Sequence, residues 1–211
     1  MRILLLSLML SGFATAATAH PHVFVTARSE IVYQADGRLT GVRQTWTFDD
    51  MFSAFATQGL DANGDGKLSR EELQPLAQTN VDSLKDFEYF TFAKLGGKQL
   101  LFKPPVDYWL DYDDRLLTLH FFLPLSSPQT QGKKPLSVQV YDPTYYVAFE
   151  MAEKDPATVA GAPACALNVV RPQELTPAQQ AAAVQLDQAD FSAANQDFGA
   201  QFANRILVNC P

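Results

Sequence analysis

Apolar and polar residues alternate along much of this chain, a pattern typical of β-strands that bury one face. The alternation is clearest over residues 23–48, where Asp36-Gly37 interrupts it with a dipeptide that favours a tight turn. Residues 23–48 are therefore predicted to form a β-hairpin with this turn at its tip.

Shorter segments further along the chain have the same apolar and aromatic character, and turn residues such as Gly96-Gly97 and Asp113-Asp114 separate them. Strands are expected at residues 87–95, 98–103, 107–112, 115–123, 136–141, 145–151, 166–170 and 205–209. Many short strands with turns at regular spacing are typical of an antiparallel sandwich or a partly open barrel. The chain is thus predicted to be mainly β.

Two segments depart from the strand pattern. Residues 49–86 place apolar residues at helical spacing on both sides of a Gly-rich acidic loop, which predicts a helix-loop-helix insert. Residues 176–190 predict a C-terminal helix, with Thr176 as its N-cap. Residues 20–211 are therefore expected to form one β-rich domain, α+β overall, with the insert at 49–86.

The loop at residues 61–72 has oxygen-bearing side chains at the spacing of an EF-hand, with Gly66 at the sharp turn. Hard oxygen ligands in such a loop favour Ca²⁺ over Mg²⁺ or Zn²⁺. Sensor EF-hands work in pairs, whereas this chain has one such loop, so we expect a structural calcium site. The predicted ligands are Asp61, Asn63, Asp65, Lys67 through its carbonyl, Ser69 through water, and Glu72.

The first 19 residues have the features of a secretory signal peptide: Arg2, an apolar stretch at 3–10, and a small-residue cleavage site ending at Ala19. The protein is thus expected to be exported to the periplasm, and no other segment is long and apolar enough to span a membrane. In an oxidising compartment Cys165 and Cys210 are expected to form a disulfide.

Composition narrows the function classes further. The formal net charge is −7 and there is no basic run, which makes nucleic acid an unexpected partner. There is no phosphate-binding Gly-rich loop and no nucleophile motif, so the sequence predicts no catalytic residues outside a metal centre. An acidic surface instead suits cations or basic partners.

The three histidines are the candidates for a transition-metal site. His20 and His22 would open the mature chain, and His120 lies within a predicted strand. Two or three imidazoles suit Zn²⁺, Ni²⁺, Co²⁺ or Cu²⁺. Pro21 has no N–H to lose, which excludes the square-planar amino-terminal copper or nickel site. Two alternatives stay open: the terminal histidines as a disordered tip, and His120 as a packed, hydrogen-bonded core residue.

The aromatic run at 141–149 provides weaker candidates for a metal shell, although its aromatic residues are also typical of core and cross-strand pairs. These candidates are Asp142, Tyr145 and Tyr146.

Several separated segments resemble one bacterial family, catalogued as domain of unknown function 1007. The segments are His-Pro-His-Val-Phe-Val at 20–25, Thr-Trp-Thr-Phe-Asp at 45–49, the loop at 61–72, Thr-Leu-His-Phe at 118–121, and the run at 141–149. The resemblance implies a periplasmic component associated with metal transport, encoded near nickel/cobalt exporters or permeases. It places the family's characteristic histidines at His20, His22 and His120.

The sequence and the resemblance together predict a periplasmic accessory protein that binds Zn²⁺, Ni²⁺ or Co²⁺. It would deliver the metal to a membrane transporter or permease and carry a structural Ca²⁺ in its loop. One alternative is a redox enzyme that holds copper in a histidine brace at the mature N-terminus. Another is a calcium-stabilised module that binds a protein partner through the insert.

Overall fold

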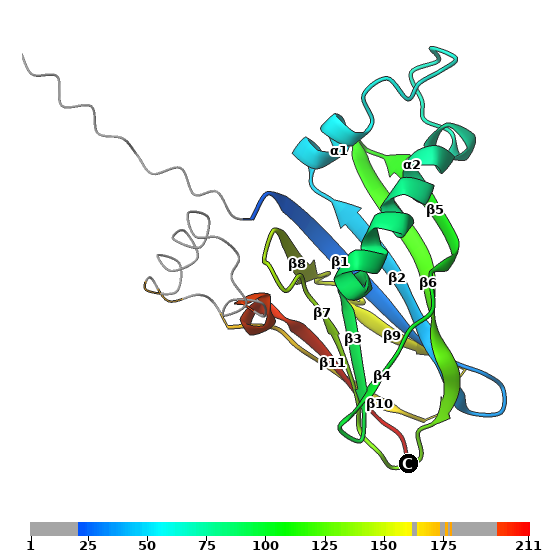
Figure 1. Ribbon diagram of the computed structural model, residues 1–211, viewed down its shortest axis with the longest axis vertical. Helices are drawn as coiled ribbons and strands as arrows, with labels where there is room; N and C mark the ends of the chain where they lie inside the picture. Colours follow the sequence, from blue (N-terminus) through cyan, green and yellow to red (C-terminus); the bar gives the residue numbers. More distant parts are fainter. Residues whose placement is uncertain (1–20, 162–163, 174–175, 177, 179–197) are drawn as a thin grey trace, which may run out of the picture.

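The structure is a computed structural model that describes residues 21–161, 164–173, 176, 178 and 198–211. The predicted signal peptide, His20 and nearly all of the predicted C-terminal helix lie outside the described residues. What is described is mainly β, with strands in two sheets and few helices (Figure 1). The prediction of a β-rich protein is therefore confirmed.

The larger sheet has the strand order β5-β6-β2-β1-β8, with β9 also paired to β1. Its strands are β1 (Val23–Tyr33), β2 (Arg38–Phe48), β5 (Val106–Asp113), β6 (Leu116–Thr130), β8 (Val147–Met151) and β9 (Ala157–Ala160). The smaller sheet has the order β10-β11-β7-β3-β4. Its strands are β3 (Thr91–Leu95), β4 (Lys98–Leu100), β7 (Leu136–Val140), β10 (Ala166–Val170) and β11 (Asn204–Asn209).

The strands β1 and β2 form the predicted hairpin. Their antiparallel register runs from Val25 opposite Phe48 to the Asp36-Gly37 turn, where Gly37 has a φ of 78°. Every second residue of β1 is buried, because successive side chains of a strand point to opposite faces. The hairpin therefore supplies one buried face and one exposed face to the larger sheet.

Pairing within the larger sheet is not purely antiparallel. Strands β8 and β9 both run parallel to β1, and the sheets do not close into a barrel. The expected strand at 87–95 begins only at Thr91, because the preceding residues Glu88, Tyr89 and Phe90 have positive φ. The short strand β9 was not predicted, since four residues are too few for a period of two to be recognised.

The insert contains two helices, α1 (Asp50–Ala56) and α2 (Arg70–Leu84). The Asp49 carboxylate caps α1 by accepting from Phe52 N at 2.8 Å. Helix α2 lies along the face of the larger sheet that the smaller sheet covers further down (Figure 1). It packs there through residues at helical spacing, Leu73, Ala77, Val81 and Leu84.

One hydrophobic core joins both sheets and α2. A 3₁₀ segment, η1 (Lys85–Phe90), connects α2 to β3, and a second one, η3 (Phe198–Phe202), precedes β11. Trp46 on β2 is 1% exposed, and its ring lies 4.8 Å from that of Phe121 and 5.0 Å from that of Phe149. These aromatic contacts join β2, β6 and β8 within the core.

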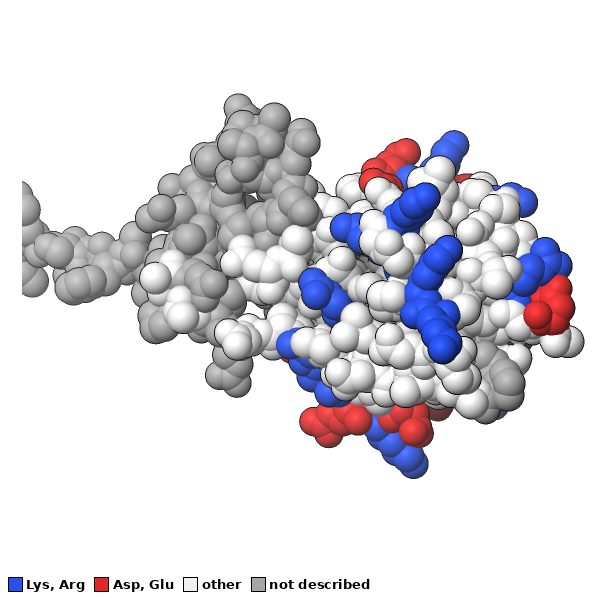
Figure 2. Space-filling view, turned by 90° about the horizontal axis from the view of Figure 1, so that it is seen from below, with Lys and Arg blue, Asp and Glu red and all other residues white. Residues whose placement is uncertain are grey.

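Acidic residues are concentrated in the helical insert and the segment that follows it. Residues 49–88 hold nine acidic and three basic residues, a net of −6. Figure 2 views the opposite end, where Lys and Arg side chains spread across the surface and Asp and Glu lie mainly at its margin. The acidic insert, which includes α1 and the loop that follows it, is where a cation would be attracted.

Candidate functional sites

The loop at residues 61–72 is organised by hydrogen bonds from its own backbone to its side chains. Asp61 Oδ1 accepts from Gly64 N at 2.8 Å and from Asp65 N at 3.1 Å, and its Oδ2 accepts from Gly66 N at 2.9 Å. The backbone amides therefore converge on the first of the predicted ligands. Gly64 and Gly66 supply the positive φ values, 72° and 78°, that this tight path requires.

Two further predicted ligands also accept hydrogen bonds from backbone amides of the loop. Asn63 Oδ1 accepts from Asp65 N at 2.8 Å, and Asp65 Oδ1 accepts from Lys67 N at 2.8 Å. Each of these side chains thus bonds the amide two residues ahead, as Asx turns do. The oxygens of residues 61, 63 and 65 are held along one short segment of backbone.

Glu72 closes the loop from the first turn of α2. Its Oε1 accepts from Ala62 N at 2.9 Å, and its Oε2 accepts from both Ser69 N and Ser69 Oγ at 2.9 Å. Together with the bond from Glu72 N to Ser69 Oγ, these contacts form a capping box. Hydrogen bonds from Ser69, and then from Ala62 and Asn63, lower the pKa of Glu72, so its carboxylate is ionised at neutral pH.

The donor set of the loop fits a hard cation, but the side chains are not gathered around one point. Within the described ranges, no group of three or more His, Cys, Asp or Glu side chains could hold a metal ion. Helix α1 also ends at Ala56, so residues 57–60 separate it from Asp61. The order helix, loop, helix is present, while the EF-hand site itself stays a prediction.

His120 lies on the outer face of the larger sheet in contact with three side chains. Its Nδ1 is 3.3 Å from Thr45 Oγ1 on β2, and its Nε2 is 3.3 Å from Asp111 Oδ2 on β5. Its ring stacks on that of Trp109, with centroids 4.7 Å apart and an interplanar angle of 8°. Both ring nitrogens thus have protein partners, which agrees with the interpretation of His120 as a packed, hydrogen-bonded residue.

Arg70 links this histidine to the loop. Its guanidinium donates to both oxygens of Asp111, at 2.9 and 3.3 Å, and lies 4.9 Å from the Trp109 ring centroid. Trp109 Nε1 donates to the same carboxylate at 3.0 Å. Since Arg70 is the tenth residue of the loop and the first of α2, these contacts attach the insert to the sheet beside His120.

Burial and charge set the ionisation of this cluster. Burial raises the pKa of Asp111, but hydrogen bonds from Arg70 and Trp109 outweigh it, so that pKa is below its ordinary value. Burial lowers the pKa of His120; Asp111 opposes this shift and Arg70 adds to it. At neutral pH the cluster therefore contains an ionised carboxylate, a guanidinium cation and a neutral imidazole.

His22 lies elsewhere, at the start of β1. It is exposed, its backbone N donates to Tyr146 O at 2.9 Å, and its ring centroid is 4.7 Å from that of Tyr146. In the larger sheet, Arg28 on β1 pairs with Thr45 on β2, and Thr45 pairs with His120 on β6, so His120 lies level with Arg28. Arg28 is five residues along β1 from Val23, about 17 Å of strand. The structure thus brings His22 to Tyr146 and leaves it apart from His120.

The other weaker candidates shape the turn before β8. Asp142 is 3% exposed, and its carboxylate accepts from Thr144 N at 2.8 Å, from Thr144 Oγ1 at 2.9 Å and from Val147 N at 2.9 Å. The ring of Tyr145 stacks on Phe202 with centroids 4.0 Å apart, and burial raises the pKa of its hydroxyl. Asp142 therefore serves as a turn-forming carboxylate.

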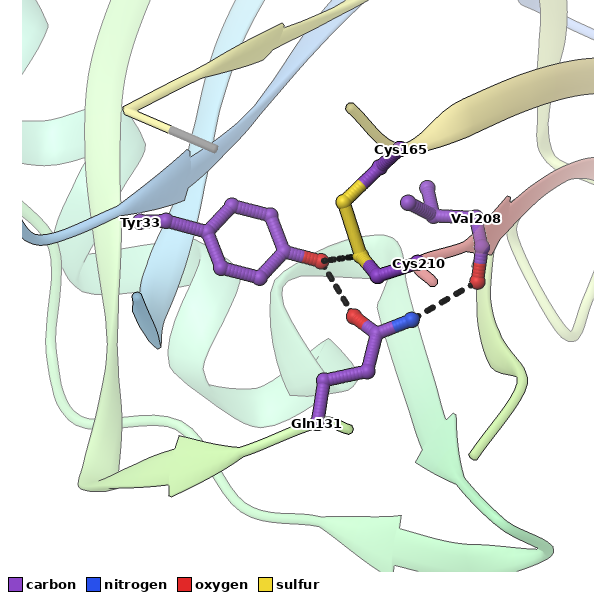
Figure 3. The surroundings of a disulfide bond; sticks show 5 residues. All are labelled: Tyr33, Gln131, Cys165, Val208 and Cys210. Carbon is purple, nitrogen blue, oxygen red and sulfur yellow. Dashed lines mark hydrogen bonds between the residues drawn. A yellow bond between two sulfur atoms is a disulfide. The ribbon is translucent and has the colours of Figure 1, made fainter. Parts of the chain in front are cut away.

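The predicted disulfide is present and connects the ends of β10 and β11. Cys165 and Cys210 are bridged with a Cα–Cα distance of 4.1 Å. The Tyr33 hydroxyl lies beside Cys210 Sγ at 3.8 Å and donates to Gln131 Oε1, while Gln131 Nε2 donates to Val208 O at 2.9 Å (Figure 3). Burial raises the pKa of Tyr33 to about 12, so the hydroxyl keeps its proton. The sequence pattern did not single out this polar network.

Two sheets around one core, a helical insert and a disulfide define a mainly β protein, and a disulfide is consistent with export. The described residues contain no helix that is long and apolar enough to cross a membrane. The chain belongs to the family described as protein of unknown function DUF1007, whose family model matches residues 4–210.

Two relatives are similar to this chain. An uncharacterized protein of Haemophilus influenzae is 29% identical over 209 residues, which is 97% of this chain and 98% of the relative. An uncharacterized 15.5 kDa protein in the trpE 3′ region of Spirochaeta aurantia is 33% identical over 99 residues, which is 47% of this chain and 70% of the relative. The family is thereby established, and its function has to be argued from the residues.

Proposed function

We propose that this protein is a periplasmic accessory protein that binds divalent cations for a membrane metal transporter or permease. It would hold Ca²⁺ in the loop at 61–72 and bind Zn²⁺, Ni²⁺ or Co²⁺ through histidine. The observation that carries the proposal is the set of loop oxygens that backbone amides already orient, from Asp61 to Glu72. The net charge of −6 over residues 49–88 supports it, since it raises the local concentration of cations.

Calcium binding in this loop requires a defined rearrangement. Glu72 would exchange its hydrogen bonds with Ser69 for bidentate contact with the ion, and Asp61, Asn63 and Asp65 would supply the opposite side. The Lys67 carbonyl and a water held by Ser69 complete the predicted set. The bound ion would neutralise carboxylates that now repel one another, and it would stiffen the segment that precedes Arg70.

The transition-metal part of the proposal rests on the start of the mature chain. His22 is exposed and directly precedes β1. Phe24 N, two residues further along, donates to Asp49 Oδ2 at 2.8 Å, so His22 lies near the start of the acidic insert. With His20 it offers two imidazoles, a donor type that suits Zn²⁺, Ni²⁺ and Co²⁺. His120 is the third imidazole of the prediction and would act separately, beside Asp111.

A second candidate function is a calcium-stabilised module that binds a protein partner. Two large apolar side chains on α1 favour it: Met51 is 80% exposed and Phe55 is 73% exposed. They are four residues apart and thus lie on one face of the helix that precedes the loop. In this case the partner would bind only with Ca²⁺ present, and changing the histidines would have no effect.

The calcium part is tested by calorimetric titration of mature, tag-free protein that starts at His20. Extracytoplasmic calcium modules bind at roughly 10⁻⁴–10⁻³ M, so the titration extends to about 10 mM. Glu72→Gln is expected to weaken Ca²⁺ binding at least tenfold, and Glu71→Gln, which changes the neighbouring carboxylate outside the ligand set, is the matched control. Equal Ca²⁺ affinity of these two variants, or no binding by the wild type, refutes a site in this loop.

The transition-metal part is tested by the same titration with Zn²⁺, Ni²⁺ and Co²⁺. His20→Ala/His22→Ala is expected to lose most of the affinity, and His120→Ala measures the separate contribution of the sheet histidine. If all variants bind as the wild type does, the histidines are not the ligands. Capture of a partner that needs Ca²⁺ and is lost in Met51→Ser/Phe55→Ser would then favour the second candidate.

A further inference from the structure

The strands of the smaller sheet and the turns beside them carry positive charge only. Residues 89–106, 131–141, 164–173 and 204–211, which contain β3, β4, β7, β10 and β11, include no Asp or Glu. The basic residues of these segments are Lys94, Lys98, Lys103, Lys133, Lys134, Arg171 and Arg205. The whole chain, in contrast, has a formal net charge of −7. The positive charge therefore belongs to this part of the fold and not to the protein in general.

Most of these cations have no anionic partner in the protein. Arg171 is held by the sheet, because its guanidinium donates to Ala152 O at 2.9 Å. The other residues are exposed, and we call them the basic surface: Lys94, Lys98, Lys103, Lys133, Lys134 and Arg205. The ion pairs within the described part of the chain are formed instead by Arg38, Arg43, Arg70 and His120. The basic surface is thus available to an external anion.

The fold gathers four lysines around two neighbouring turns. Gly96 N donates to Pro135 O at 2.9 Å, so the β3–β4 turn lies against the turn before β7. The stem of Lys134 packs over the first turn, since a Cβ at Gly96 would lie 3.3 Å from Lys134 Cδ. Lys94 and Lys98 flank the β3–β4 turn, and Lys133 precedes Lys134. This end of the molecule is the lower end in Figure 1 and the one that Figure 2 views.

Arg205 extends the positive charge over the outer face of the smaller sheet. Lys94 on β3 lies opposite Ser137 on β7, and Ser137 lies opposite Leu207 on β11. Arg205 is two residues from Leu207, so its side chain points to the same face of the sheet as that of Lys94. Two strand spacings and two residues along the strand separate Lys94 and Arg205 by about 12 Å.

Leu101 is a large apolar side chain within these basic surroundings. It is 65% exposed, and it follows β4 between Lys98 and Lys103. Its carbonyl accepts from Ser126 N at 2.8 Å, and Lys103 N donates to Pro124 O at 2.8 Å, so the backbone on both sides is fixed to β6. Leu101 is therefore held at the surface beside the lysines.

The composition of this surface favours a lipid bilayer over a protein partner. Protein interfaces are depleted in Lys and are centred on buried aromatic or Arg side chains, whereas the basic surface has mainly Lys and a single exposed Leu beside it. Groups of about four to eight basic residues attract anionic lipid headgroups. An apolar side chain among them adds affinity by entering the interfacial region of the bilayer.

We infer that the basic surface binds a bilayer that contains anionic phospholipid. Headgroup phosphates contact the lysines and Arg205, and the Leu101 side chain enters the bilayer interface. Because the whole chain is net negative, the attraction comes from this local surface and not from the total charge. The binding does not depend on a cation in the loop at 61–72, which follows α1 at the other end of the molecule in Figure 1.

The test measures how mature protein that starts at His20 partitions onto sedimented lipid vesicles, with EDTA present to prevent bridging by divalent cations. Vesicles of phosphatidylcholine alone are compared with vesicles that contain about 30 mol% phosphatidylglycerol, which makes the surface potential negative. We expect about tenfold stronger partitioning onto the anionic vesicles. Most of it should be lost between about 30 and 300 mM NaCl, because salt screens exposed charges. Equal partitioning onto both kinds of vesicle overturns the inference.

Two charge-reversal pairs locate the binding surface. Lys98→Glu/Lys133→Glu changes the two neighbouring turns, and Arg115→Glu/Lys154→Glu changes the net charge equally at exposed positions outside the basic surface. The first pair should weaken partitioning about tenfold and the second should leave it unchanged. Equal losses from both pairs would mean that total charge governs the binding, which contradicts the inference. Retention on a polyglutamate resin without vesicle binding would assign the surface to an acidic protein and would also contradict it.

A further pair of variants tests the apolar contact. Leu101→Ser should weaken partitioning onto anionic vesicles about threefold at low and at high salt, because the transfer of an apolar side chain is not screened. Met51→Ser on α1 is the matched control, since Met51 is 80% exposed and lies outside the basic surface. Equal effects of the two variants would refute the entry of Leu101 into the bilayer interface.

Discussion

The disulfide offers the sharpest test of how the C-terminal part of this fold is held. Cys165 directly precedes β10 and Cys210 directly follows β11, so Cys165→Ala/Cys210→Ala releases both strands at the same end. The bridge spans a sequence separation of 45 residues. In the chain-entropy account, a cross-link over a loop of that length stabilises the folded state by about 4 kcal/mol at 25 °C.

This free energy converts into a measurable change of the melting temperature. In a chain of this size 1 kcal/mol corresponds to roughly 2–4 °C, so the double variant should melt about 8–16 °C lower. Thermal unfolding followed by circular dichroism, with and without a reductant, measures the shift. The reductant should lower the Tm of the wild type and leave that of the double variant unchanged.

A small effect would refute this reasoning. If the double variant loses less than about 1 kcal/mol, the β10–β11 ladder and the hydrogen bonds of Gln131 with Tyr33 and with Val208 O must hold the strands without the bridge. Tyr33→Phe distinguishes these contributions, because it removes the hydroxyl and retains the buried ring. A loss from Tyr33→Phe that exceeds the loss from the double variant would assign the stabilisation to the polar network.

Other positions give further predictions. A Cβ at Gly41 would lie 2.4 Å from Leu123 O, so Gly41→Ala should destabilise the protein by about 1–3 kcal/mol. Urea unfolding should show this as a lower midpoint, and an unchanged midpoint would contradict the close approach of β2 to β6. In the folded protein the pKa of His120 lies below its ordinary value, so on acidification the imidazole of the unfolded chain is protonated at a higher pH than that of the folded protein. Stability should therefore fall as pH drops through about 6.5, and His120→Gln should flatten this dependence in denaturant titrations from pH 8 to 5. Equal slopes for the two proteins would show that another group titrates.

The sequence was informative wherever a structure depends on neighbouring residues. Alternation and Asp36-Gly37 were enough to predict the β1–β2 hairpin, because strand burial and turn chemistry are both local. The oxygen-rich loop at 61–72 could be singled out for the same reason, since Asp61, Asn63 and Asp65 bond amides a few residues ahead. The disulfide was predictable because the chain has only two cysteines.

Contacts between distant residues could not be read in this way. The parallel pairing of β8 and β9 with β1 depends on where the chain returns after crossing the smaller sheet, and no local pattern records that path. The sequence singled out His120 as a candidate metal ligand, but it gave no sign that Thr45 and Asp111 contact the two ring nitrogens. Likewise, Trp46 looked like any core aromatic residue.

The sequence by itself determined the β-rich character, the hairpin, the oxygen-rich loop and the cysteine pair, because these follow from residue type and spacing along the chain. The tertiary structure alone decided that His22 and His120 lie apart, that Arg70 joins the loop to the sheet, and that the Trp46 N–H is buried without a partner among the described residues. The physical reason is that hydrogen-bond partners and cavities are made by residues far apart in sequence, whose meeting depends on the packing of the whole core.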